Sequence, residues 1–202
     1  MAMDHTFFEQ AFRAAGEALL DAAGKAGLHM RPATLTRSAR ARCMASFRLI
    51  AAIVRRLLFL LALEIELAPL RPRPARPAVL AEGVEDVTAS FGPQHTGFGL
   101  SPHLSGPFPD SFRTFSGPRP GGQVPAGPLL ARWAQLYRVL KDPDASARRL
   151  ARTIERWRKA GEPAPMCAPL PGARRLGPEL GLVSSLLPQL VGRALQAWKD
   201  TS

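Results

Sequence analysis

The order of apolar and polar positions predicts helices toward both ends of the chain and no regular element in its middle. The longest uninterrupted helical pattern runs from Thr34 to Leu67 and contains neither proline nor glycine. At the α-helical step of about 100° per residue, its large apolar side chains share one broad arc, and four of its arginines form a narrow ridge. The arc contains Phe47, Leu49, Ile50, Ile53, Val54, Leu57, Leu60, Leu61 and Ile65, and the ridge contains Arg37, Arg40, Arg48 and Arg55. The pattern therefore predicts one long amphipathic helix.

Three environments are open to this helix. A membrane span needs about 20 mostly apolar residues, yet the longest charge-free run, 57–63, is much shorter. Arg55 and Arg56 would lie near the centre of such a span, where each arginine costs about 2.5 to 3.5 kcal/mol, so a span is disfavoured. The helix can instead pack against other helices of the chain. It can also lie in a membrane interface, with its arginines toward anionic headgroups.

A shorter helix is predicted before it, from His5 to Ala26. Asp4 suits the N-cap, and Gly27 suits the end of the helix. Its apolar positions recur at steps of three and four residues: Phe8, Phe12, Ala15 and Leu19. We expect a helical hairpin in which this stripe covers part of the apolar arc.

The composition changes sharply at Pro69. Twelve of the 20 prolines lie between Pro69 and Pro128, and the phenylalanines there are scattered among Gly, Ser and Pro. Such a segment cannot bury enough apolar surface to fold alone. We expect residues 69–127 to be an irregular, disordered linker.

Helical periodicity returns at residue 128. One helix is predicted from Pro128 to about Leu140, and a second begins at the N-cap Asp142 and reaches Lys159. The last covers Glu179–Asp200, where Pro188 should kink or split it. The predicted fold is all-α, with about five helices: a hairpin in 1–68, the linker in 69–127 and a helical part in 128–202.

The chain is strongly basic, with a net charge of +11 and a pI near 11.2. This balance favours an anionic partner such as nucleic acid, lipid headgroups or an acidic protein surface, although a GC-rich coding sequence also raises the arginine content. The cations of the predicted helix that ends at Lys159 lie opposite its apolar face. They form a basic stripe of Arg148, Arg149, Arg152, Arg156 and Lys159. The stripe can bind phosphates, or it can simply be the solvated face of the helix.

Motifs for catalysis, metal binding or cofactor binding are missing from the sequence. Cys43 and Cys167 have no CxxC or Cys/His spacing, and the four histidines lie in different segments. Neither a nucleophile elbow nor a phosphate-binding glycine loop occurs. We therefore expect no enzyme activity, no cofactor, no metal and no small-molecule ligand, and a reducing, cytoplasmic location.

Function follows from the surfaces alone. We expect an interaction or scaffold protein, with a protein partner or with peripheral contact at the cytoplasmic face of the inner membrane. The predicted membrane or partner surface consists of Phe47, Arg48, Ile50, Val54, Arg55, Arg56, Leu57 and Leu61. The alternatives are a basic nucleic-acid-associated protein that uses the basic stripe, and a single-pass membrane protein.

Overall fold

A computed structural model describes residues 5–68, 122–161 and 176–200, together with 164, 165, 167 and 170; the side chains of 199 and 200 are not described. The prediction of an all-α protein is confirmed. The elements are α1 (His5–Lys25), the 3-10 turn η1 (Leu28–Met30), β1 (Thr34–Thr36), α2 (Arg37–Glu64), β2 (Gln123–Pro125), α3 (Gly127–Lys141), α4 (Pro143–Lys159) and α5 (Pro178–Asp200).

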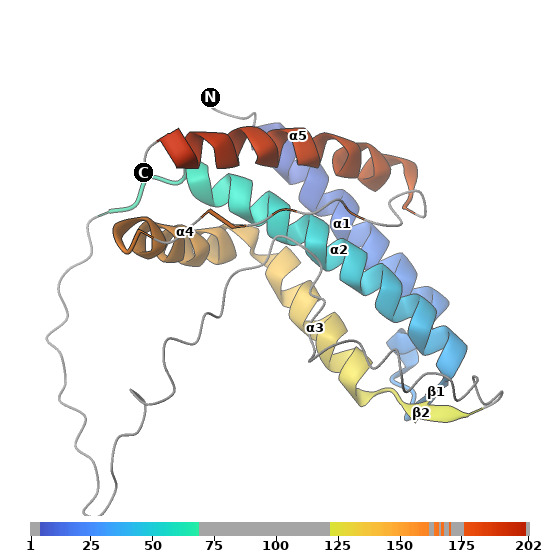
Figure 1. Cartoon of the computed structure of the whole chain (residues 1–202). Helices are drawn as coiled ribbons and strands as arrows, with labels where there is room; N and C mark the ends of the chain where they lie inside the picture. Colours follow the sequence, from blue (N-terminus) through green and yellow to red (C-terminus); the bar gives the residue numbers. More distant parts are fainter. Residues whose placement is uncertain are drawn as a thin grey trace, which may run out of the picture.

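Helix α2 lies at the centre of the assembly and contacts each of the other four helices. α1 runs alongside it, and α5 and α4 lie on opposite sides of its C-terminal half (Figure 1). The β1–β2 pair, from which α3 continues, also contacts α2. Buried residues of all five helices form one hydrophobic core, so the helices before and after the linker are packed together.

Local sequence signals explain where α2 and α4 begin and where α4 ends. The Thr36 hydroxyl accepts a hydrogen bond from the Ala39 amide at 3.2 Å, and the Asp142 carboxylate accepts one from the Ala145 amide at 2.9 Å. These caps satisfy amides that have no partner inside the helix. Gly161 follows α4 with φ of 67°, the left-handed conformation that glycine adopts without steric cost.

The structure differs from the sequence prediction in the β1–β2 pair. Thr34–Thr36 was expected to begin the long helix and Gln123–Pro125 to end the linker, but the two segments pair antiparallel, with Leu35 opposite Val124. The amide of Ala126 extends the pairing by donating to the carbonyl of Ala33 at 3.0 Å. The β-branched threonines favour an extended backbone, and the partner strand lies far away in the sequence.

Two further predictions can be placed. α5 continues through Pro188 as one helix and is not split there. Asp4 and most of the predicted linker, residues 69–121, lie outside the described residues, so the expectation of disorder stays a prediction.

Candidate cationic interface

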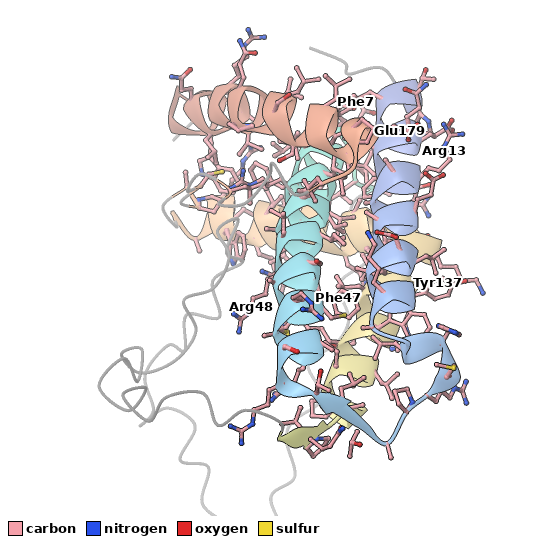
Figure 2. The ribbon with its side chains drawn as sticks, turned by 90° about the vertical axis from the view of Figure 1, so that its right-hand side faces the viewer. Phe7, Arg13, Phe47, Arg48, Tyr137 and Glu179 are labelled. Atoms are coloured by element: carbon pink, nitrogen blue, oxygen red, sulfur yellow. The ribbon has the colours of Figure 1, made fainter. Side chains whose placement is uncertain are left out.

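The predicted membrane or partner surface of α2 is mostly inside the protein. Six of its eight residues are at most 8% exposed: Phe47, Ile50, Val54, Arg56, Leu57 and Leu61. Arg48 is exposed and Arg55 is half-buried. Figure 2 shows the neighbours Phe47 and Arg48 pointing to different sides of α2, with Phe47 toward the other helices. These apolar side chains therefore do not form a surface in the folded structure.

The burial of α2 changes along its length. From Ala51 to Ala62 every residue except Arg55 is buried, whereas from Arg37 to Arg48 the arginine side remains exposed. The change occurs because α4 and α5 cover the C-terminal half. A helix that is buried all round has neighbours on every side, which the wheel of a single helix does not predict.

The two central arginines of α2 have lost much of their contact with water. Arg56 is 0% exposed. Burial lowers the pKa of its guanidinium below the usual range, and the Coulombic effect of Cys167 opposes this shift. Burial also lowers the pKa of Arg55, and the like charge of Arg132 on α3 lowers it further.

The basic stripe of α4, in contrast to Arg56, lies on the surface of the protein. All five of its residues, Arg148, Arg149, Arg152, Arg156 and Lys159, are exposed. The other face of α4 is anchored in the core by Ala147, Leu150, Ala151 and Ile154. Arg148, Arg152 and Arg156 are four residues apart, so they follow one another at about 6 Å along the helix axis.

Short polar contacts orient part of the basic stripe. Arg149 donates to the Ser146 hydroxyl at 3.3 Å, and Arg156 donates to the Thr153 hydroxyl at 3.1 Å. Lys159 pairs with Glu155 at 2.6 Å. Within the described part of the chain, Arg148 and Arg152 pair with no carboxylate, so their guanidinium groups are available to an external anion.

A residue beside the basic stripe fixes the end of α4. The guanidinium carbon of Arg158 lies 4.6 Å from the ring centroid of Trp198 on α5. Trp198 in turn stacks on Phe59 of α2, with centroids 6.3 Å apart. Cation–π and aromatic contacts of this kind stabilise packing by about 0.5 to 1.5 kcal/mol each. Sequence analysis missed this contact because nothing in the sequence places residues 158 and 198 together.

Sequence analysis also missed a region without acidic residues. Residues 26–63 contain seven arginines and 122–141 contain three Arg or Lys, and neither segment has an Asp or Glu. The β1–β2 pair and the contact between α2 and α3 bring the two segments together. Exposed Arg37, Arg40 and Arg48 line a shallow hollow of about 570 Å³ beside Val124. The composition was visible in the sequence, but the proximity of the segments depends on the fold.

Searches for other kinds of site are negative over the described residues. They hold no group of three or more His, Cys, Asp or Glu that can bind a metal ion. None of their helices combines the length and the apolar content needed to cross a bilayer.

Comparisons of the chain with protein-family models, with curated proteins and with solved structures find no match. The function is therefore argued from the cationic surfaces themselves.

Proposed function

We propose that this protein is a non-enzymatic binding protein that attaches to the phosphate backbone of nucleic acid through the basic stripe of α4. The observation that carries the proposal is the exposure of all five cations on a helix whose other face is fixed in the core. A cationic row held by a rigid helix loses little conformational freedom when it meets a row of phosphates.

The burial of α2 supports nucleic acid over a membrane surface. Insertion into a bilayer needs exposed apolar side chains beside the cations. The large exposed apolar side chains of the described residues, Leu20, Met30, Tyr137, Leu182 and Leu186, all lie outside α4. The apolar arc that was expected to insert is packed between helices.

The composition of α4 favours arginine contacts, which reach phosphates and guanine alike, and offers none to adenine. α4 contains neither Asn nor Gln, the side chains that pair with adenine. If all five cations meet phosphates, the binding constant for duplex DNA should fall with salt with a log–log slope of about −4 to −5.

The test is binding of the full chain to an oligonucleotide duplex over a range of salt concentrations. The stripe variant R148E/R149E/R152E should bind the duplex at least about tenfold more weakly. The magnitude of its log–log salt slope should be smaller than that of the wild type by roughly 3. The matched control R13E/R138E/R193E changes three other exposed arginines and the net charge equally. It should keep the wild-type slope, and circular dichroism should show both variants folded.

Two results would contradict the proposal. Equal weakening by the stripe variant and the control would mean that net charge, rather than this stripe, attracts the nucleic acid. Binding to vesicles with anionic lipid but not to the duplex would identify the membrane surface as the partner instead.

A further inference from the structure

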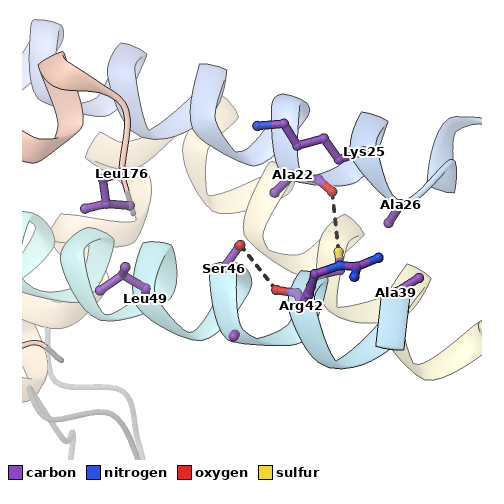
Figure 3. Close-up of a pocket in the computed structure, with 10 residues that line it drawn as sticks. Ala22, Lys25, Ala26, Ala39, Arg42, Ser46, Leu49 and Leu176 are labelled. Carbon is purple, nitrogen blue, oxygen red and sulfur yellow. Dashed lines mark hydrogen bonds between the residues drawn. The ribbon is translucent and has the colours of Figure 1, made fainter. Parts of the chain in front are cut away.

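A pocket of about 310 Å³ lies between the C-terminal part of α1 and the N-terminal part of α2. Figure 3 shows Lys25 and Ala22 on the α1 side and Arg42, Ser46 and Leu49 on the α2 side. The lining residues are Ala22, Lys25, Ala26, Ala39, Arg42, Cys43, Ala45, Ser46, Leu49 and Leu176. At about 30 Å³ per water, the volume holds about ten groups of that size.

The lining combines apolar walls with positive charge. Four alanines and two leucines supply the walls, two cations lie among them, and none of the lining residues is acidic. Lys25 is partly neutralised by Asp21, which it contacts at 2.6 Å. Arg42 is exposed and, within the described part of the chain, pairs with no carboxylate. The pocket therefore offers one free guanidinium beside an apolar wall.

We propose that this pocket binds a small monocarboxylate with an apolar tail. The planar guanidinium of Arg42 donates two parallel hydrogen bonds to the carboxylate, the geometry in which arginine binds carboxylates most strongly. Lys25 adds a second, weaker positive field, and the tail lies against Leu49, Leu176 and the alanines. This inference concerns a different surface from the basic stripe and does not rest on the proposed function.

The neighbouring surface restricts the ligand to one negative charge. A second hollow of about 360 Å³ shares Ala22, Lys25, Ser46 and Leu176 with the pocket. Glu17, Asp21 and Glu179 also line this hollow, so a second carboxylate placed there would be repelled. The apolar tail can continue toward Leu180, whereas a dicarboxylate cannot.

The cysteine in the pocket does not act as a nucleophile on the ligand. Cys43 donates a hydrogen bond from its thiol to the carbonyl of Ala22 at 3.6 Å. Burial raises the pKa of this thiol to about 11, so almost no thiolate exists near neutral pH. Binding is therefore expected to be reversible and non-covalent.

The test is calorimetric titration of the full chain with octanoate, octanol and octanedioate. Octanoate should bind with a Kd of about 1 mM or tighter, and the alcohol and the dicarboxylate at least about tenfold more weakly. Arg42→Glu should weaken octanoate binding by at least about tenfold. Its matched control Arg40→Glu, an exposed arginine of the same helix outside this pocket, should stay within about twofold.

A second pair of variants separates the pocket from general charge. Ala45→Trp fills the pocket at an exposed lining position and should block octanoate, whereas Ala41→Trp, also exposed but outside the pocket, should not. The proposal is overturned if wild-type protein shows no saturable octanoate binding. It is also overturned if octanol binds equally well or if both tryptophan variants behave alike.

Discussion

Helices α2 and α4 both combine an apolar face with a row of arginines, and they pack directly against each other. In α4 the apolar residues are buried and the basic stripe remains in solvent. In α2 every residue of 51–62 except the half-buried Arg55 is buried, and Arg56 is enclosed among them. Similar patterns therefore lead to different positions for the cations.

The difference arises from the number of neighbours that each helix has. α4 packs mainly on α2, with lesser contacts to α3 and the contact of Arg158 with Trp198 of α5, whereas α2 packs against all four other helices. The ridge of α2 stays exposed or half-buried, but Arg56 lies between the ridge and the apolar arc, where the packed helices enclose it, and a buried charge needs compensation. An arginine at the edge of the assembly needs none.

The strongest test of this comparison makes the same Arg→Glu substitution at a buried position of α2, an exposed position of α2 and an exposed position of α4. Arg56→Glu places a carboxylate where the fold encloses a cation, and it should lower the free energy of unfolding by about 3 to 5 kcal/mol. Arg48→Glu on the exposed part of α2 and Arg152→Glu on α4 should each change it by no more than about 0.5 kcal/mol. Urea denaturation measures all three.

A fourth variant sharpens the result. Arg56→Met keeps much of the side-chain volume but removes the charge. A small loss for Arg56→Met beside a large loss for Arg56→Glu would show that packing matters more than the charge. Equal, small losses for Arg56→Glu and Arg48→Glu would mean that Arg56 is not enclosed and that the contrast between α2 and α4 is wrong.

The sequence was sufficient for features that are encoded locally. The N-cap at Asp142, the end of α4 at Lys159 and the buried stripe of α1 follow from short-range rules, and the structure confirms them. The basic stripe of α4 was also found, because a helix with one apolar face has a predictable solvated face.

Features that depend on distant segments could not be predicted in this way. The pairing of Thr34–Thr36 with Gln123–Pro125, the contact of Arg158 with Trp198 and the pocket beside Arg42 each join parts of the chain whose proximity is set by tertiary packing. The burial of Arg56 belongs to the same group, because the helical wheel shows which residues share a face but not how many faces are covered.

The next prediction concerns stability at alkaline pH, to which α2 and α4 should contribute differently. The folded pKa of Cys43 on α2, about 11, lies above the usual value of 9.0, so the unfolded chain loses this proton first. Below pH 9 the protonated Cys43 thiol makes its full contribution to the free energy of unfolding. This contribution is lost at about 1.4 kcal/mol per pH unit as the pH rises toward 11. The expected total is roughly 2 to 3 kcal/mol. α4 has no cysteine and contributes nothing of this kind.

Urea denaturation of wild-type protein and Cys43→Ala between pH 8.5 and 11 measures this effect. The variant should lose less stability over the interval than the wild type, although its stability at pH 8.5 is lower because a buried side chain is truncated. Parallel plots of unfolding free energy against pH for the two proteins would show that Cys43 ionises equally easily in the folded and unfolded chains. The packing of α1 on this side of α2 would then not exclude water from the thiol.

The smallest expected effect concerns the caps. Asp142→Ala removes the acceptor for the Ala145 amide and a negative charge at the N-terminus of α4, and should cost about 1 kcal/mol. Thr36→Ala should cost less, because its bond to the Ala39 amide is longer and the uncharged hydroxyl adds no dipole term. Hydrogen exchange should quicken at the first amides of α4 in the first variant, while the amides of 51–62 in α2 stay protected in both. Quickened exchange in 51–62 after Asp142→Ala would mean that α4 and the buried half of α2 open as one unit, so that the basic stripe is as firmly held as the core beneath it.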